Sequence, residues 1–211
     1  MINVYKYLNH TNVEGPGVRF CLWVQGCKKH CVGCYASETW SFEVNKLFSP
    51  EEIFSMIPSD VEGITFLGGE PFEQAKDLTV LAQMCKEKNL SVVCFTGYAL
   101  EEIQNGNDVN KKNLLNSIDL LIDGAYEEDK YDLSRPWVGS SNQRYIFLTD
   151  RYSKEDILKY RNKVEMRISK DGKLEINGMG DFKSIERKFC LQLGKNNVEL
   201  LKSEREQKYG Q

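Results

Sequence analysis

The strongest constraint on the fold is an alternation of short apolar runs with longer amphipathic runs over the first 150 residues. Each apolar run has the length of a buried strand, and the runs between them favour helices. Strands that alternate with helices predict a parallel sheet, because each helix returns the chain to the same edge. The expected strands cover 19–25, 63–67, 91–95, 118–122 and 145–148.

Two helices are expected between these strands. Ser49-Pro50-Glu51-Glu52 has the pattern of a capping box with proline at the first helical position. Apolar residues recur at near-helical spacing over 72–88, which predicts a second helix. We therefore predict an α/β fold, a partial (β/α) barrel of parallel strands, with an open doubly wound sheet as the alternative.

The pattern changes after residue 150. Apolar and polar residues alternate over 164–168 and 174–176, and the turn pair Asp171-Gly172 lies between them, so a β-hairpin is expected. A helical period over 182–193 predicts one more helix, followed by a charged tail. The hairpin, the helix and the tail would form a small C-terminal appendage. The expected domains are 1–150 and 151–211.

Composition excludes several classes of function. The formal net charge of −3 gives no reason to expect nucleic-acid binding. No basic stretch followed by a long apolar run opens the chain, and its apolar runs are too short to span a bilayer. We therefore expect a cytoplasmic protein with no membrane association.

The seven cysteines fall into two groups. An odd count without a secretory signal argues against a disulfide framework. Four are scattered through apolar stretches and are expected to be small core residues; these are Cys21, Cys85, Cys94 and Cys190. The other three crowd into one short segment as Cys27, Cys31 and Cys34.

This crowded group indicates an iron–sulfur centre. Cubane clusters are usually held by four thiolates, so three would leave one iron open to bind another molecule. The alternative is a zinc site with His30 or a distant cysteine as fourth ligand. Lys28 and Lys29 within the segment would lessen the cost of holding anionic thiolates.

Each unusual loop follows an expected strand. The cysteine segment follows the first strand, and the next three strands are followed by Gly68-Gly69-Glu70-Pro71, Thr96-Gly97-Tyr98 and Asp123-Gly124. Loops at the carboxyl ends of parallel strands meet on one face. The four loops are therefore expected to form one active site.

In these residues the chain resembles the radical S-adenosylmethionine superfamily, and within it the activating enzymes of anaerobic ribonucleoside-triphosphate reductase. Gly33 before the third cysteine, where many superfamily members have an aromatic residue, favours this branch. The segment from Arg151 onward is longer than the branch's compact members need. Further segments that resemble the pattern of this branch are Gly15-Pro16-Gly17-Val18-Arg19, Gly26-Cys27, Cys34-Tyr35, Trp40 and the run from Gly139 to Arg144.

The resemblance implies two cofactors and their ligands. Cys27, Cys31 and Cys34 would hold a 4Fe–4S cluster whose open iron takes the amino and carboxylate groups of S-adenosylmethionine. Backbone of the first glycine loop would flank the methionine moiety, a second group would contact adenine, and a threonine would reach the ribose. No catalytic side chain beyond these is assigned. The implied contacts are Gly68, Gly69 and Glu70 for the methionine moiety, Gly33, Cys34 and Tyr35 for the adenine, and Thr96 for the ribose.

The resemblance also implies the reaction. One electron from a flavodoxin-like donor would cleave S-adenosylmethionine to methionine and a 5′-deoxyadenosyl radical, which would generate a glycyl radical on a partner, an anaerobic ribonucleotide reductase large subunit. Four residues would lie near the partner peptide or the cofactor, with a strand entrance or a turn as the plain structural alternative. These are Asp123, Asn142, Gln143 and Arg144.

Two other functions stay open. The chain could be a radical enzyme that acts on a small molecule or another peptide, or a metal-stabilised binding module without catalysis. Hydrogen-atom abstraction needs no proton shuttle, so neither His10 nor His30 is assigned a role.

Overall fold

The computed structural model describes residues 1–170, 174–181 and 184–185. The chain divides into two compact units, Met1–Met179 and Gly180–Gln211. The turn expected at Asp171-Gly172, the charged tail and Cys190 lie outside the described residues, as does most of the helix expected over 182–193. In the part of the chain that is described, no helix is long and apolar enough to cross a membrane.

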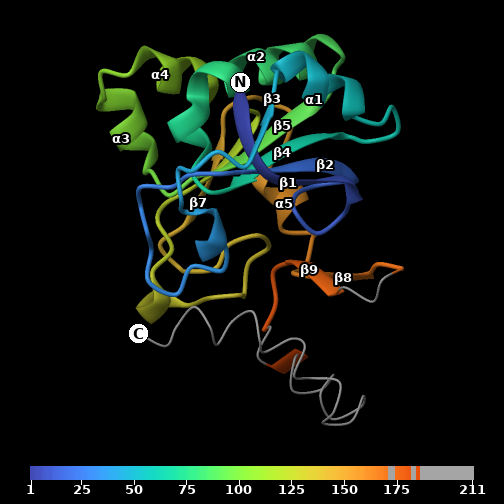
Figure 1. Cartoon of the computed structure of the whole chain (residues 1–211). Coiled ribbons are helices and arrows are strands. Elements are labelled where there is room, and N and C mark those ends of the chain that lie inside the picture. Colours follow the sequence, from blue (N-terminus) through green and yellow to red (C-terminus); the bar gives the residue numbers. More distant parts are fainter. Residues whose placement is uncertain (171–173, 182–183, 186–211) are drawn as a thin grey trace. The chain divides into compact units, whose positions relative to one another are not determined.

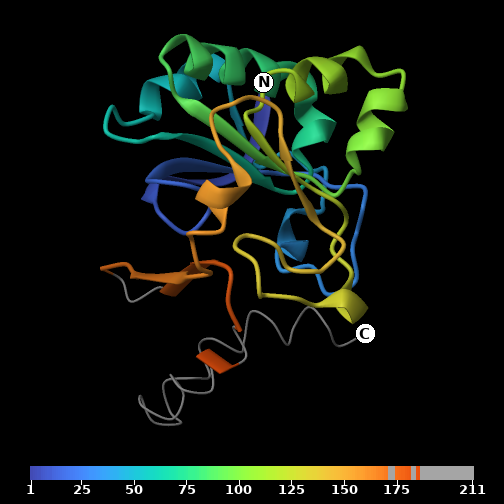
Figure 2. The ribbon, with the colours of Figure 1, turned by 180° about the vertical axis from the view of Figure 1, so that it is seen from behind.

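A seven-stranded sheet organises the first unit (Figure 1). Its central four strands are parallel neighbours in chain order, as predicted. The order of these four strands in the sheet does not reverse, as it would in a doubly wound fold. The helices α1, α2, α3 and α4 lie on one side of the sheet in both views (Figures 1 and 2), so the arrangement is that of a partial barrel. The strands, in sheet order, are β3 (Lys46–Phe48), β1 (Ile2–Thr11), β2 (Arg19–Val24), β4 (Gly63–Gly68), β5 (Ser91–Phe95), β6 (Leu120–Asp123) and β7 (Arg144–Phe147).

The prediction that the fifth strand is parallel was wrong. β7 pairs antiparallel with β6, because the segment between them contains only the short 3-10 helix η3 (Glu128–Lys130) and so cannot make a helical crossover. β1 and β3 were not expected; both are antiparallel additions at the other edge. β1 buries only Ile2, Val4 and Thr11, so it lacks the continuous apolar run used to find the central strands.

The helices follow local signals. Ser49 caps α1 (Pro50–Met56) with both bonds of the predicted capping box. The helix expected over 72–88 is present as the 3-10 turn η2 (Pro71–Gln74) followed by α2 (Ala75–Glu87). Three short helices were not predicted: α3 (Leu100–Asn105), α4 (Val109–Leu115) and α5 (Lys154–Ile157).

Alternate residues of the parallel strands enter different cores. Phe66, Cys94 and Leu121 pack with apolar residues of α1, α2 and α4 in the larger core. Val93 and Ile122 point to the other face and pack with Trp137, from the segment between β6 and β7. Both faces of the central strands are therefore buried, which explains why the sequences of these strands are continuously apolar.

The predicted hairpin is present as β8 (Val164–Ile168) and β9 (Leu174–Gly178), and it belongs to the first unit. Glu14, buried at 4% exposure, accepts a hydrogen bond from the Gly178 backbone N–H at 2.7 Å and one from the Asn177 amide. Burial is the main cause that raises the pKa of Glu14 to about 7, against these two hydrogen bonds.

Glu14→Gln is expected to flatten the pH dependence of stability. A raised carboxyl pKa means that the contribution of Glu14 to wild-type stability is greatest below about pH 4.5 and is lost as the pH rises to about 7, since the unfolded chain gives up the proton first. The linkage is worth on the order of 3 kcal/mol. Urea unfolding of metal-free wild type and variant between pH 4.5 and 8 measures it; Glu70 contributes to both proteins, so their difference isolates Glu14. A difference in unfolding free energy that is constant with pH would contradict this.

Candidate active site

The four loops after the parallel strands meet on one face, as predicted. The Glu70 N–H donates to the Gly26 carbonyl at 2.8 Å, which joins the loop after β4 to the cysteine loop (residues 27–34). The Glu70 carboxylate accepts from the Thr96 hydroxyl and the Gly97 N–H, both at 2.8 Å. The loop after β6 closes the series, because the Gly124 N–H donates to the Tyr98 carbonyl at 3.1 Å.

The cysteine loop surrounds two of its sulfurs with N–H donors. The Cys27 sulfur accepts from the Lys29 and His30 N–H groups, and the Cys34 sulfur accepts from the Ala36 N–H and the Trp40 side chain. Burial raises the pKa of both thiols, and these donors act in the opposite direction. N–H donors favour the ionised sulfur that an iron–sulfur cluster requires, so this loop fits such a group.

The three thiols do not converge on one point. Among the described residues, no group of three or more His, Cys, Asp or Glu side chains is arranged to hold a single metal ion. A cubane has a different geometry, because each ligating thiolate binds its own iron. Three cysteines spread along one loop are therefore compatible with a cluster.

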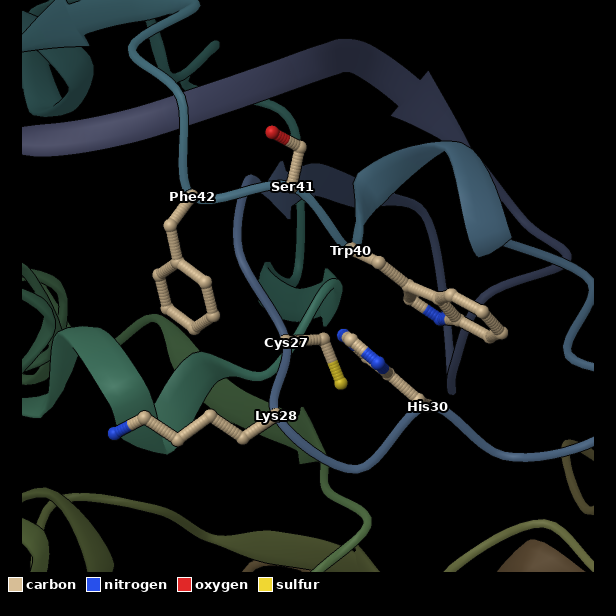
Figure 3. A pocket seen from close by; sticks show the side chains of 6 residues that line it. All are labelled: Cys27, Lys28, His30, Trp40, Ser41 and Phe42. Atoms are coloured by element: carbon tan, nitrogen blue, oxygen red, sulfur yellow. The ribbon is translucent and has the colours of Figure 1, made fainter.

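A pocket of about 340 Å³ opens beside the loop (Figure 3). The His30 ring stacks on Trp40 at 4.7 Å between ring centres, and Figure 3 shows the Cys27 sulfur beside the His30 ring. The Lys28 side chain runs away from that sulfur. The pocket is also lined by Ser41 and Phe42, which the sequence analysis did not predict as site residues.

The lysines of the loop are paired with carboxylates. Lys28 binds Glu73, and Lys29 lies 3.1 Å from Glu102. Their charges are therefore partly neutralised, which weakens the expected benefit for the thiolates. The other expected surface histidine, His10, pairs with Asp60 at 2.8 Å.

The first glycine loop needs its glycines. Gly68 has φ of +102°, and a Cβ on Gly69 would lie 2.4 Å from the Gly26 carbonyl oxygen. Glu70 is 1% exposed; burial raises its pKa to about 7, although the Phe72 N–H, the Gly97 N–H and the Thr96 hydroxyl donate to it. Its carboxylate thus caps η2 and joins two loops, and the Thr96 hydroxyl is engaged in the same network.

The polar run before β7 is largely paired within the chain. The Arg144 guanidinium binds the fully buried Asp123 carboxylate at 2.5 and 3.0 Å and also pairs with Glu101. Gln143 accepts from the Gly139 N–H and donates to the Gly124 carbonyl. Asn142 donates to the Ala125 carbonyl at 2.7 Å, whereas its Oδ1 is buried with no hydrogen-bond partner. That unpaired acceptor lies in the loop region that the sequence assigned to the site.

Two sequence features lie elsewhere. Arg19 begins β2, at the opposite end of the strand from the cysteine loop, and its buried guanidinium binds Thr65 and the carbonyls of Ile64 and Ser91. Gly15 makes room for that side chain, because a Cβ there would lie 2.7 Å from the Arg19 Cδ. The scattered cysteines that the structure describes are fully buried, as predicted; these are Cys21, Cys85 and Cys94.

Comparison with known proteins identifies the family. Residues 13–146 match the family model described as a 4Fe-4S single cluster domain. The anaerobic ribonucleoside-triphosphate reductase-activating protein of Pasteurella multocida is 36% identical over 156 residues, which cover 67% of this chain and 95% of that protein. The protein of the same name from Enterobacteria phage T4 is 31% identical over 68% of this chain and 93% of its own length.

A solved structure, QueE from Escherichia coli, matches 46% of this chain with a TM-score of 0.34 and 19% identity, a likeness too slight to carry an argument. The matches to the relatives cover nearly the whole length of those proteins, and the family-model match over residues 13–146 contains all four loops of the site. On this evidence, the chain belongs to the family of anaerobic ribonucleoside-triphosphate reductase-activating proteins.

Proposed function

We propose that this chain is a radical S-adenosylmethionine enzyme that generates a glycyl radical on an anaerobic ribonucleotide reductase. The observation that carries the proposal is the cysteine loop, with three thiols and surrounding N–H donors, in a chain whose relatives are named as activating proteins of the anaerobic ribonucleoside-triphosphate reductase. Cys27, Cys31 and Cys34 would hold the 4Fe–4S cluster. When bound, it supplies the electron that splits S-adenosylmethionine into methionine and a 5′-deoxyadenosyl radical.

The chain's own residues bind and orient the cofactor. Gly68 and Gly69 keep the loop after β4 free of side chains next to the cysteine loop, so backbone can approach the methionine moiety. Glu70 holds the loops after β4 and β5 together, and Thr96 is fixed by it. Gly33, Cys34 and Tyr35 would contact the adenine, where Tyr35 packs edge-on to Tyr126 at 6.1 Å.

The residues at the end of β6 and around the start of β7 would line the substrate side. Asp123 and Arg144 form a fixed pair there, and Gln143 shapes the turn. The buried unpaired Oδ1 of Asn142 is an acceptor suited to a donor on the cofactor or the partner peptide. A flavodoxin-like protein would deliver the electron. This arrangement favours positioning over proton transfer, consistent with hydrogen-atom abstraction.

Anaerobic reconstitution with iron and sulfide tests the proposal. With a chemical reductant and S-adenosylmethionine, we expect 5′-deoxyadenosine; with the reductase added, we expect a glycyl radical doublet in electron paramagnetic resonance. Cleavage without a doublet on the reductase would favour a radical enzyme with another substrate. Zinc near one per chain and no 5′-deoxyadenosine would favour a binding module.

A further inference from the structure

A buried carboxylate beside the cysteine loop pairs with Lys28 but has no role in the site described so far. Glu73 lies in η2, three residues after Glu70, and its side chain is 6% exposed. Two ammonium groups and one hydroxyl converge on it: Lys28 forms an ion pair, Lys111 lies at 3.2 Å, and Tyr98 donates a hydrogen bond. Burial acts to raise the pKa of Glu73, but these partners outweigh it and leave the pKa lowered.

The partners of Glu73 come from three separate segments. Lys28 belongs to the cysteine loop, Tyr98 to the loop after β5, and Lys111 to α4. The Lys111 ammonium also lies over the Tyr98 ring, at 3.9 Å from its centre. Lys29 lies over the ring as well, at 4.0 Å. One carboxylate therefore ties the cysteine loop to two neighbouring segments.

The link to Lys28 acts on the first turn of the cysteine loop. Lys28 follows Cys27 directly, and the next two backbone N–H groups, of Lys29 and His30, donate to the Cys27 sulfur. A tether on the Lys28 side chain restrains the backbone that aims these donors. Losing it would let the turn move and the donors lose their alignment with the sulfur.

We propose that Glu73 is a positioning residue: through Lys28 it fixes the turn that carries Cys27, and its charge helps to set the reduction potential of the centre bound there. The first half concerns the metal-free chain. The second half rests on the proposed function, because it needs a bound cluster. Charges and hydrogen bonds near a cluster shift its potential, and a buried charge is screened less by solvent than an exposed one.

The first experiment uses the metal-free protein. Alkylation of Cys27 by iodoacetamide, followed by mass spectrometry under anaerobic conditions, reports the order of the turn. We expect Glu73→Gln to speed this alkylation several-fold, and Lys28→Met to do the same, while circular dichroism and the urea midpoint show that both variants remain folded.

Glu102→Gln is the matched control, because Glu102 also pairs with a lysine of the cysteine loop but is 51% exposed. The two pairs differ in their carboxylates, since Glu73 is 6% exposed, whereas their lysines are 68% (Lys28) and 23% (Lys29) exposed. A solvated carboxylate contributes little, so alkylation should stay near the wild-type rate. If Cys27 in Glu73→Gln is alkylated at the wild-type rate, the positioning role is overturned. It is also overturned if Glu73→Gln is alkylated fast but Lys28→Met at the wild-type rate, because the effect would then not pass through Lys28. Neither result depends on whether the chain cleaves S-adenosylmethionine.

The second experiment measures the midpoint potential of the reconstituted cluster. Removing the negative charge in Glu73→Gln should make reduction easier and the potential more positive, whereas Lys28→Met should make it more negative. The double variant should lie between them. We expect single-variant shifts of up to about tenfold in the one-electron equilibrium, which equals 59 mV. Wild-type potentials in both single variants overturn the electrostatic half. A wild-type chain that takes up no cluster refutes the proposed function and leaves the alkylation result standing.

Discussion

Cys31→Ala is expected to abolish iron–sulfur binding and S-adenosylmethionine cleavage together. With one of three thiols removed, a replacement ligand would have to come from elsewhere, and the other described cysteines, Cys21, Cys85 and Cys94, are fully buried in the core. Burial raises their thiol pKa values, so they are poor thiolate donors as well. We expect cleavage to fall by more than about 100-fold, since even indirect supports of metal ligands cost up to that much.

The iron content and the 5′-deoxyadenosine yield of the anaerobically reconstituted variant measure this loss. Cys94→Ala is the matched control, because it removes a sulfur from the core and not from the loop. It should lose about 1 kcal/mol of stability and keep its iron. A Cys31→Ala protein with full iron and full cleavage would refute the ligand assignment.

Gly69→Ala is expected to separate the cysteine loop from the loop after β4. The added Cβ would lie 2.4 Å from the Gly26 carbonyl oxygen, which also accepts the Glu70 N–H at 2.8 Å. Both sides of this contact are backbone, so no side chain can rotate away to relieve it. We expect a loss of roughly 2–4 kcal/mol in the free energy of unfolding. Cleavage of S-adenosylmethionine should fall on the order of 10–100-fold, because the loop that holds the cluster and the loop that contacts the cofactor would be displaced from each other.

Gly97→Ala provides the comparison within the same site. Its nearest neighbour would be the Lys29 Cγ at 3.1 Å, part of a flexible side chain that can shift. We expect a cost below about 1 kcal/mol and nearly full cleavage. Urea unfolding of the metal-free proteins and 5′-deoxyadenosine formation by the reconstituted ones separate the two variants. Equal effects of the two substitutions would show that the Gly69–Gly26 approach is not what holds these loops.

Much of the site was predictable because its signals are local. Short apolar runs marked the four parallel strands, and the rule that their carboxyl ends share one edge brought the loops together. Ser49 marked the start of α1 through its own capping bonds. The spacing of three cysteines indicated the metal chemistry, and the family comparisons agree with it.

Other parts were decided by contacts between distant residues. β7 is antiparallel because only a short 3-10 helix lies between it and β6, although its composition resembles that of a parallel strand. Arg144 could have faced solvent or substrate; its pairing with Asp123 arises from the register of β6 and β7. Glu73 gave no signal, since a lone glutamate after a turn is usually solvated.

The sequence by itself determined the order of the four parallel strands, the helices α1 and α2, the loop that carries the thiols and the family to which the chain belongs. These are properties of residues close together along the chain, where periodicity and spacing are direct evidence. Only the tertiary structure decided which carboxylate meets which cation, and how closely Gly26 approaches Gly69. Such contacts join residues far apart in sequence, and the packing of the whole sheet sets them.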